Sequence, residues 1–221
     1  MLVRKSTKCL AAAGSGWTVE LLQPLLDDPV CLDGLVTLTQ LIANDLLDPH
    51  SKLLLTTSIL HGIPKPESDE LRPLAVGECF LKLAAKYCLD LVRADLEDLL
   101  APLQLGIGVP GGVERALQAI QASIEANPDS HVTIHVDFRN AFNTLLRDAM
   151  LQAVYGEDKL KLLWRVFSFS YSDPSLLLLR EHGVVVDSLL SQRGVKQGCT
   201  LASLGFAIAL QPHYLAALDG S

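Results

Sequence analysis

The chain has 221 residues, of which 49% are hydrophobic, so it can bury a core and is not a disordered segment. Its apolar runs are too short to span a bilayer, and its five scattered cysteines contain no CxxC pair. These features argue against a membrane protein, a zinc site and a disulfide framework, and they favour an intracellular location. The formal net charge of −7 argues against a nucleic-acid partner, because proteins that grip phosphate backbones usually carry a basic surface.

The first third of the chain predicts short helices followed by a β-hairpin. Residues 17–55 contain leucines at helical spacing. Residues 56–63 and 72–76 are predicted strands, because prolines and a polar turn separate two short apolar runs.

The middle of the chain predicts two helices and a strand. One long helix is expected from about residue 78 to 100 and another from about 113 to 126, with a glycine-rich loop over 106–112 between them. Residues 131–138 alternate between polar and apolar types, which predicts a half-buried strand whose polar face ends in Asp137.

The last third predicts further helices, a second hairpin and a buried helix. A turn at His182-Gly183 separates two apolar runs, and the segment from Leu201 is apolar on all sides, which is typical of a buried helix. The other expected helices and strands are 141–154, 158–169, 176–180 and 184–191. The whole pattern predicts an α+β fold.

Three features could bind an anion or a metal ion. Asp137 ends a strand and precedes a helix, a position at which α/β sheets hold ligands. Gln197 and Gly198 precede the buried helix, whose free main-chain N–H groups favour anions. Lys65 and Arg72 project from the predicted hairpin, where two cations can clamp a triphosphate. Each feature alone also has a common structural explanation, namely a helix cap, an ordinary loop or solvated charges.

Three runs that contain these residues occur in a set order. They are Lys65-Pro66 … Arg72-Pro73-Leu74, Asp137-Phe-Arg-Asn-Ala-Phe-Asn143 and Gly194-Val-Lys-Gln-Gly198-Cys-Thr-Leu201. In this order they resemble the motifs of reverse transcriptases from non-LTR (LINE-type) retrotransposons: the fingers motif K-x … R-P-I, the first palm motif and the G-x-x-Q-G-x-x-L motif. The resemblance covers roughly residues 55–215.

The resemblance implies that Asp137 binds a metal. Asp137 would hold the catalytic Mg²⁺ (or Mn²⁺) ions with help from the Phe138 carbonyl, and the intact enzyme would copy RNA into DNA by a two-metal mechanism. Its partners would be an RNA template, a DNA primer and deoxynucleoside triphosphates.

The resemblance also implies a nucleotide pocket. Phe142 would block a ribose 2′-hydroxyl and so select deoxynucleotides. Gln197 and Gly198 would line the pocket beneath the base and sugar, and Lys65 and Arg72 would hold the triphosphate.

The family likeness divides the chain into three expected regions: an N-terminal helical region over residues 1–55, the fingers of a right-hand polymerase over 56–130, and a partial palm over 131–221. The chain departs from the family because no Y-x-D-D carboxylate hairpin and no thumb follow Gly198. We therefore expect a truncated reverse transcriptase that is inactive as this chain alone.

Two alternatives differ in class. The first is a dinucleotide-binding (Rossmann) protein, because Gly106 to Gly111 matches G-x-G-x-x-G and is followed by a predicted helix and then by Asp137. Pro102 shortens the strand that should precede the glycines, and Pro110 lies where the motif needs main-chain N–H groups, so both argue against this alternative. The second alternative is a reverse-transcriptase-like module kept as a non-catalytic binding or structural protein, which the missing carboxylate motif favours.

Overall fold

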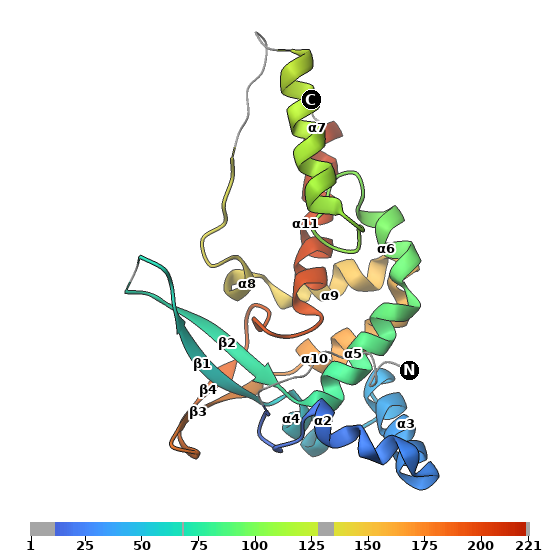
Figure 1. Cartoon of the computed structure of the whole chain (residues 1–221), viewed down its shortest axis with the longest axis vertical. Helices are drawn as coiled ribbons and strands as arrows, with labels where there is room; N and C mark the ends of the chain where they lie inside the picture. Colours follow the sequence, from blue (N-terminus) through green and yellow to red (C-terminus); the bar gives the residue numbers. More distant parts are fainter. Residues whose placement is uncertain (1–11, 68, 128–134, 220–221) are drawn as a thin grey trace.

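The computed structural model describes residues 12–67, 69–127 and 135–219, and it is an α+β structure. A four-stranded sheet lies on one side of a group of helices (Figure 1). The strands are β1 (Ser58–Pro64), β2 (Leu71–Gly77), β3 (Ser175–Glu181) and β4 (Val184–Ser191). The helices are α2 (Val19–Leu22), η1 (Pro24–Asp27), α3 (Pro29–Ala43), α4 (Pro49–Thr56), α5 (Cys79–Leu91), α6 (Arg93–Leu100), α7 (Gly112–Ala126), α8 (Ala141–Thr144), α9 (Arg147–Gly156), η2 (Asp158–Leu160), α10 (Lys161–Tyr171) and α11 (Ala202–Asp219).

The sheet joins two antiparallel hairpins through one parallel pair of strands. Its order is β2-β1-β3-β4, in which β1 runs antiparallel to β2 and parallel to β3, and β3 runs antiparallel to β4. Both hairpins confirm strands predicted from the sequence. The turn between β3 and β4 has positive φ at His182 (49°) and Gly183 (83°), as two-residue turns of tight hairpins require.

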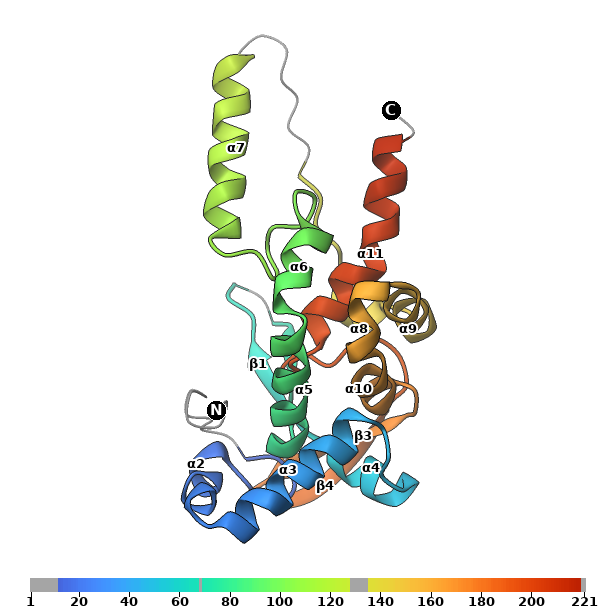
Figure 2. The same cartoon turned by 90° about the vertical axis from the view of Figure 1, so that its right-hand side faces the viewer.

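The main core lies between α5, α9, α10 and the first half of α11. Gly205 on α11 permits this packing, because a methyl group added there would lie 2.6 Å from Met150 Sδ and 2.9 Å from a ring carbon of Phe167. The prediction that this helix is buried throughout is wrong, since the core ends at Ile208 and residues 212–217 are exposed. Figure 2 shows α7 and the end of α11 projecting away from the body of the molecule.

Two predicted helices are each divided in the structure. The helix expected over 78–100 is α5 and α6, because the buried Val92 leaves the helical backbone (φ −106°, ψ 10°). The helix expected over 141–154 is α8 and α9. Between them the Leu145 carbonyl accepts the N–H of Gly194 (2.9 Å) instead of continuing the helix.

The predicted strand over residues 131–138 is not part of the sheet that the structure describes. Residues 131–134 lie outside the described residues, and residues 135–138 are exposed and pair with no described strand. Alternation along a chain indicates half-burial, but it does not supply the hydrogen-bonded neighbour that a strand needs. The prediction that Asp137 lies on a strand of the sheet is therefore wrong for the residues that the structure describes.

The Rossmann alternative fails on the fold. Residues 101–105, which precede the glycine-rich loop, form turns and irregular chain rather than a strand. The fingerprint requires a strand directly before its glycines. Across the three described ranges, no helix combines the length and the apolar character needed to cross a bilayer.

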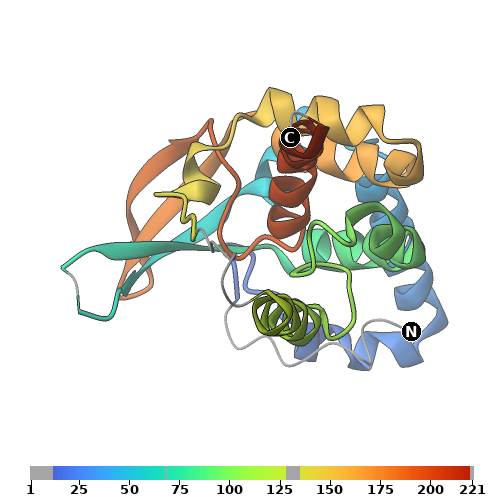
Figure 3. The same cartoon turned by 90° about the horizontal axis from the view of Figure 1, so that it is seen from above.

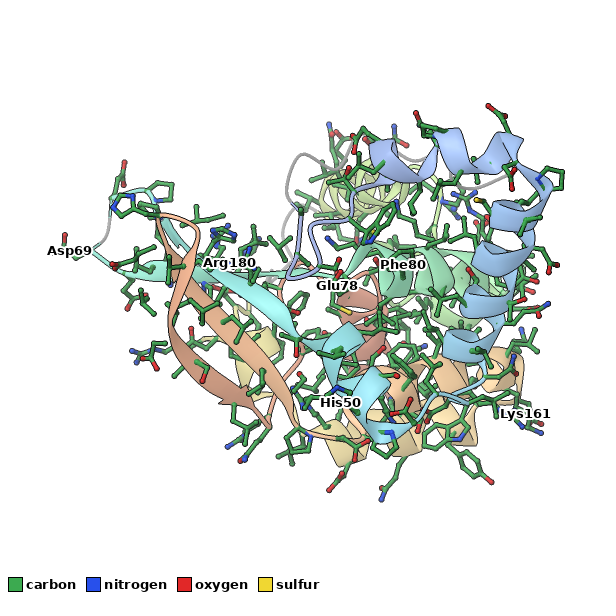
Figure 4. All side chains as sticks on the ribbon, turned by 90° about the horizontal axis from the view of Figure 1, so that it is seen from below. His50, Asp69, Glu78, Phe80, Lys161 and Arg180 are labelled. Atoms are coloured by element: carbon green, nitrogen blue, oxygen red, sulfur yellow. The ribbon has the colours of Figure 1, made fainter. Side chains whose placement is uncertain are left out.

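The N-terminal segment is fixed to the junction of β2 and α5. The Ser15 N–H and hydroxyl both donate to the Glu78 carboxylate, at 2.9 and 2.5 Å, and the Trp17 ring centroid lies 5.9 Å from that of Phe80. Figure 4 labels Glu78 and Phe80 at this junction, between the hairpin and the helices. The contact ties the base of the β1–β2 hairpin to the helical part of the molecule.

Candidate functional site

The loop of residues 194–198 is joined by its main chain to the segment that follows Asp137. The Val195 N–H donates to the Phe142 carbonyl (2.8 Å). Gly194 has φ +69°, and a methyl group added there would lie 2.5 Å from the carbonyl oxygens of Phe142 and Asn143. This close approach of two backbones explains why a glycine opens the loop.

The same loop is joined to strand β2 on its other side. The Ala75 N–H donates to the Gln197 carbonyl (2.7 Å). Gly198 has φ +98°, and a methyl group added there would lie 2.7 Å from the Ala75 carbonyl oxygen. The loop therefore lies between the hairpin and α8, as Figures 1 and 3 also show from two directions.

Lys65 and Arg72 share one face of the hairpin, and the loop lies along the open edge of β2. The Leu74 side chain lies 3.1 Å from the position of a methyl group added at Gly198, and alternation places Arg72 on the same face as Leu74. Ile63 pairs with Arg72, so Lys65, two residues beyond Ile63, shares that face as well. Arg72 is exposed, so its guanidinium is available to a ligand.

An ion pair lies at the tip of the hairpin. Lys65 Nζ lies 2.5 Å from Glu70 Oε2. This hydrogen bond, and then the charges of Lys65 and Arg139, hold the pKa of the Glu70 carboxyl below its ordinary value. Arg139 follows Asp137 by two residues in the sequence.

Asp137 and Phe138 are exposed, and Phe142 is half-buried. Phe142 packs against Phe206, a residue of α11 that was not predicted to belong to the site. The Phe206 ring centroid on α11 lies 5.3 Å from that of Phe142 and 6.4 Å from that of Phe138. Phe206 belongs to a long apolar run, which gave no signal to separate it from core residues. These ring contacts attach the start of α11 to the segment after Asp137.

Two buried cations, Arg147 and Lys196, lie beneath the loop, and sequence reasoning missed both. Both residues are only 7% exposed. The Arg147 guanidinium donates to the carbonyls of Gly194 (2.8 Å) and Ser191 (2.9 Å). The only available signal was the lysine inside the run Gly-Val-Lys-Gln-Gly.

Asp137 is the carboxylate that the sequence predicts for this site, and it precedes Phe142 by five residues. Carboxylate and carbonyl oxygens are the ligands that Mg²⁺ prefers, so Asp137 and the Phe138 carbonyl fit one part of a magnesium site. No group of three or more His, Cys, Asp or Glu side chains suited to a metal ion occurs among the residues that the structure describes. The contacts bring the loop, the hairpin and the segment after Asp137 together, and a cleft lined by all the predicted residues stays a prediction.

A separate groove of about 900 Å³ lies between α3, α5 and the start of α11. Its lining includes Leu35, Val36, Tyr87, Thr200 and Ser203, and none of the predicted site residues. It approaches the loop from the helical side, since Thr200 follows Gly198 by two residues.

The chain is similar to a retrotransposable-element protein and to a solved telomerase structure. The chain is 30% identical over 207 residues to the retrotransposable element SLACS 132 kDa protein of Trypanosoma brucei gambiense, a match that covers 94% of this chain. Apo telomerase from Candida tropicalis, truncated from its C-terminal domain, superposes with a TM-score of 0.50 and 15% identity over 79% of this chain. No protein-family model matches.

The chain spans 17% of the length of the SLACS protein and 40% of the telomerase chain. The telomerase likeness shows a shared fold, and the SLACS likeness shows a relative among retrotransposable elements. Together the two similarities support a reverse-transcriptase-like domain.

Proposed function

We propose that this chain carries part of the nucleotide site of a non-LTR reverse transcriptase, an enzyme that acts inside the cell. In this proposal the β1–β2 hairpin belongs to fingers over residues 56–130, and residues 131–221 form a partial palm after an N-terminal helical region. The observation that carries the proposal is the pair of main-chain hydrogen bonds that join the loop of residues 194–198 to Phe142 on one side and to Ala75 on the other.

The hairpin would bind the triphosphate. Lys65 supplies a compact charge and Arg72 a planar fork of donors, and both lie on one face of the hairpin. Lys65 would exchange its bond to Glu70 for one to a phosphate oxygen. This local cluster of cations, joined by Arg139, is compatible with a net negative chain, because a ligand responds to the nearby field.

The loop and Phe142 would bind the base and sugar. Gln197 and Gly198 are fixed against β2, so they offer a rigid surface beneath the nucleotide. Phe142 is held by Phe206, so its ring cannot easily turn away from a 2′-hydroxyl. The site would thus favour deoxynucleotides by steric exclusion.

Asp137 and the Phe138 carbonyl would hold Mg²⁺ or Mn²⁺ at the edge of the same site. The bound ions would supply the stabilisation of attacking and leaving oxygens that nucleotidyl transfer requires. The exposure of Asp137 suits a hydrated ion, since Mg²⁺ keeps several waters. An RNA template and a DNA primer would complete the site.

Nucleotide binding to the 221-residue chain tests this proposal. A fluorescent deoxynucleoside triphosphate with Mg²⁺ should bind the wild type, and Arg72→Ala should weaken binding at least about ten-fold, because one charge-assisted hydrogen bond contributes about 1.5–3 kcal/mol. Lys161→Ala is the matched control, since Lys161 lies on the far side of the molecule from the hairpin tip at Asp69 (Figure 4). Equal affinity in Arg72→Ala and the wild type would remove Arg72 from the site.

Primer extension on an RNA template separates the catalytic proposal from a non-catalytic module. The 221-residue chain alone should not extend a primer, because one carboxylate cannot position two metals. A longer protein that joins this segment to a Y-x-D-D-type hairpin should do so. Failure of the longer protein, with nucleotide binding intact, would favour the non-catalytic alternative.

A further inference from the structure

The loop of residues 194–198 is held from below by two buried cations. The Arg147 guanidinium makes three hydrogen bonds: to the Gly194 carbonyl (2.8 Å), the Ser191 carbonyl (2.9 Å) and the Ser191 hydroxyl (2.6 Å). Lys196 Nζ donates to the Thr56 carbonyl (2.7 Å) and reaches the Ser175 hydroxyl (3.2 Å). Arg147 therefore fixes the approach to the loop, and Lys196 ties the middle of the loop to the end of α4 and the start of β3.

Neither cation is paired with a carboxylate in the part of the chain that the structure describes. All of the acceptors named above are neutral carbonyl or hydroxyl groups, and buried charges are ordinarily paired. The Tyr171 ring gives partial compensation, with its centroid 5.3 Å from Arg147 Cζ and 6.0 Å from Lys196 Nζ. Burial lowers the pKa of Arg147 and that of Lys196, the latter to about 8, so keeping two charges here is costly.

Because burying these two charges lowers the stability of the folded state, their presence is consistent with a functional role. Both side chains act on the main chain of residues 191–198, which leaves β4 at Ser191 and then forms no helix or strand before α11. The Gln197 carbonyl accepts the Ala75 N–H at 2.7 Å only where that main chain keeps its present path. Arg147 and Lys196 are the side chains that set this path from the buried side.

We propose that Arg147 and Lys196 are positioning residues, which hold the main chain of residues 191–198 in the conformation that binds the nucleotide. This inference rests on the proposed function. Neither residue would touch the nucleotide. Each would act through the position of Gln197 and Gly198.

Hydrogen exchange in the 221-residue chain tests the positioning directly. The amides of Ala75, Gly194 and Val195 donate across the loop contacts. In Lys196→Met and in Arg147→Met they should exchange at least about ten-fold faster than in the wild type, as expected when one or two buried hydrogen bonds are lost. Amides within α3 should change by less than about two-fold, a difference that a merely destabilising substitution would not produce.

Conservative and control variants keep the test decisive. Lys196→Met preserves volume and removes a buried charge, a change that proteins often tolerate. Arg147→Lys keeps the charge without the three-bond fork, so it should also release the Gly194 and Val195 amides. Arg165→Met, at an exposed arginine on α10, should change none of them. Unchanged exchange at the three loop amides, or acceleration equal to that in α3, would overturn the proposal.

Nucleotide affinity separates this inference from the proposed function. Lys196→Met should weaken binding of a fluorescent deoxynucleoside triphosphate about ten-fold, while Arg165→Met should not. If the wild type binds no nucleotide, the proposed function fails and the exchange result still decides whether the two cations position the loop. If the wild type binds and Lys196→Met binds equally well, the positioning role is wrong and the proposed function stands.

Discussion

Replacing Lys196 by methionine should change how the stability of this protein depends on pH. Burial, as the main cause, lowers the pKa of Lys196 from its ordinary value of 10.5 to about 8, although the neighbouring Cys199 acts in the opposite direction. In the unfolded chain the amine has its ordinary pKa. Between about pH 8 and pH 10.5 the unfolded state therefore binds more protons than the folded state, so the free energy of unfolding of the wild type rises with pH across this window.

The size of this effect follows from the two pKa values. A difference between 10.5 and about 8, at about 1.4 kcal/mol for each pH unit, corresponds to about 3.5 kcal/mol, most of which falls between pH 7.5 and 10.5. This contribution is fully present above about pH 10.5 and is lost as the pH falls through about 8. Lys196→Met also loses the bonds to Thr56 and Ser175, but that loss shifts the whole curve and leaves its slope unchanged.

Urea denaturation between pH 7.5 and 10.5 measures the effect. The free energy of unfolding of the wild type should rise by about 3 kcal/mol relative to Lys196→Met across this range. Titrating groups that do not interact with Lys196 are present in both proteins and cancel in the comparison. Lys159→Met, at an exposed lysine, should keep the pH dependence of the wild type. Parallel curves for the wild type and Lys196→Met would refute the reasoning that Lys196 is buried as a costly charge.

Two further substitutions test the loop and the sugar site. Gly198→Ala should lower the free energy of unfolding by about 2–4 kcal/mol, because the new methyl group meets the Ala75 carbonyl and the positive φ disfavours any side chain; a change below about 0.5 kcal/mol in a urea titration would contradict the close approach. Phe142→Val, in a protein that joins this segment to a second carboxylate motif, should raise the ratio of ribonucleotide to deoxyribonucleotide kcat/KM, and an unchanged ratio in a folded variant would remove Phe142 from the site.

Local chemistry made the hairpins and most helices predictable. The turns of the two hairpins are marked by Pro64 and Pro66 in the first and by His182-Gly183 in the second. Such turn preferences act over only a few residues, so they can be recognised in the sequence. The helical spacing of apolar residues predicted α7 and α10 for the same reason. The joining of the two hairpins into one sheet through β1 and β3 depends on residues more than a hundred positions apart, so no local pattern could indicate it.

Tertiary contacts decided what the sequence left unpredicted. The break between α8 and α9 follows from the bond that Leu145 accepts from Gly194, about fifty residues away. Arginine and lysine usually lie on the surface, so nothing in the sequence indicated that Arg147 and Lys196 would be buried. The motif order predicted which segments meet near the loop, whereas the roles of Asp137 and Phe142 stay predictions because contacts alone do not test chemistry.

Photocrosslinking of a nucleotide tests the central claim most directly. The claim is that the β1–β2 hairpin, the segment after Asp137 and the loop of residues 194–198 form one nucleotide site. An azido-labelled deoxynucleoside triphosphate, irradiated with the 221-residue chain and Mg²⁺ and followed by peptide mapping, should label peptides from at least two of these three segments. Unlabelled deoxynucleoside triphosphate should abolish that labelling. Specific labelling confined to other parts of the chain, such as the groove between α3 and α5, would contradict the claim.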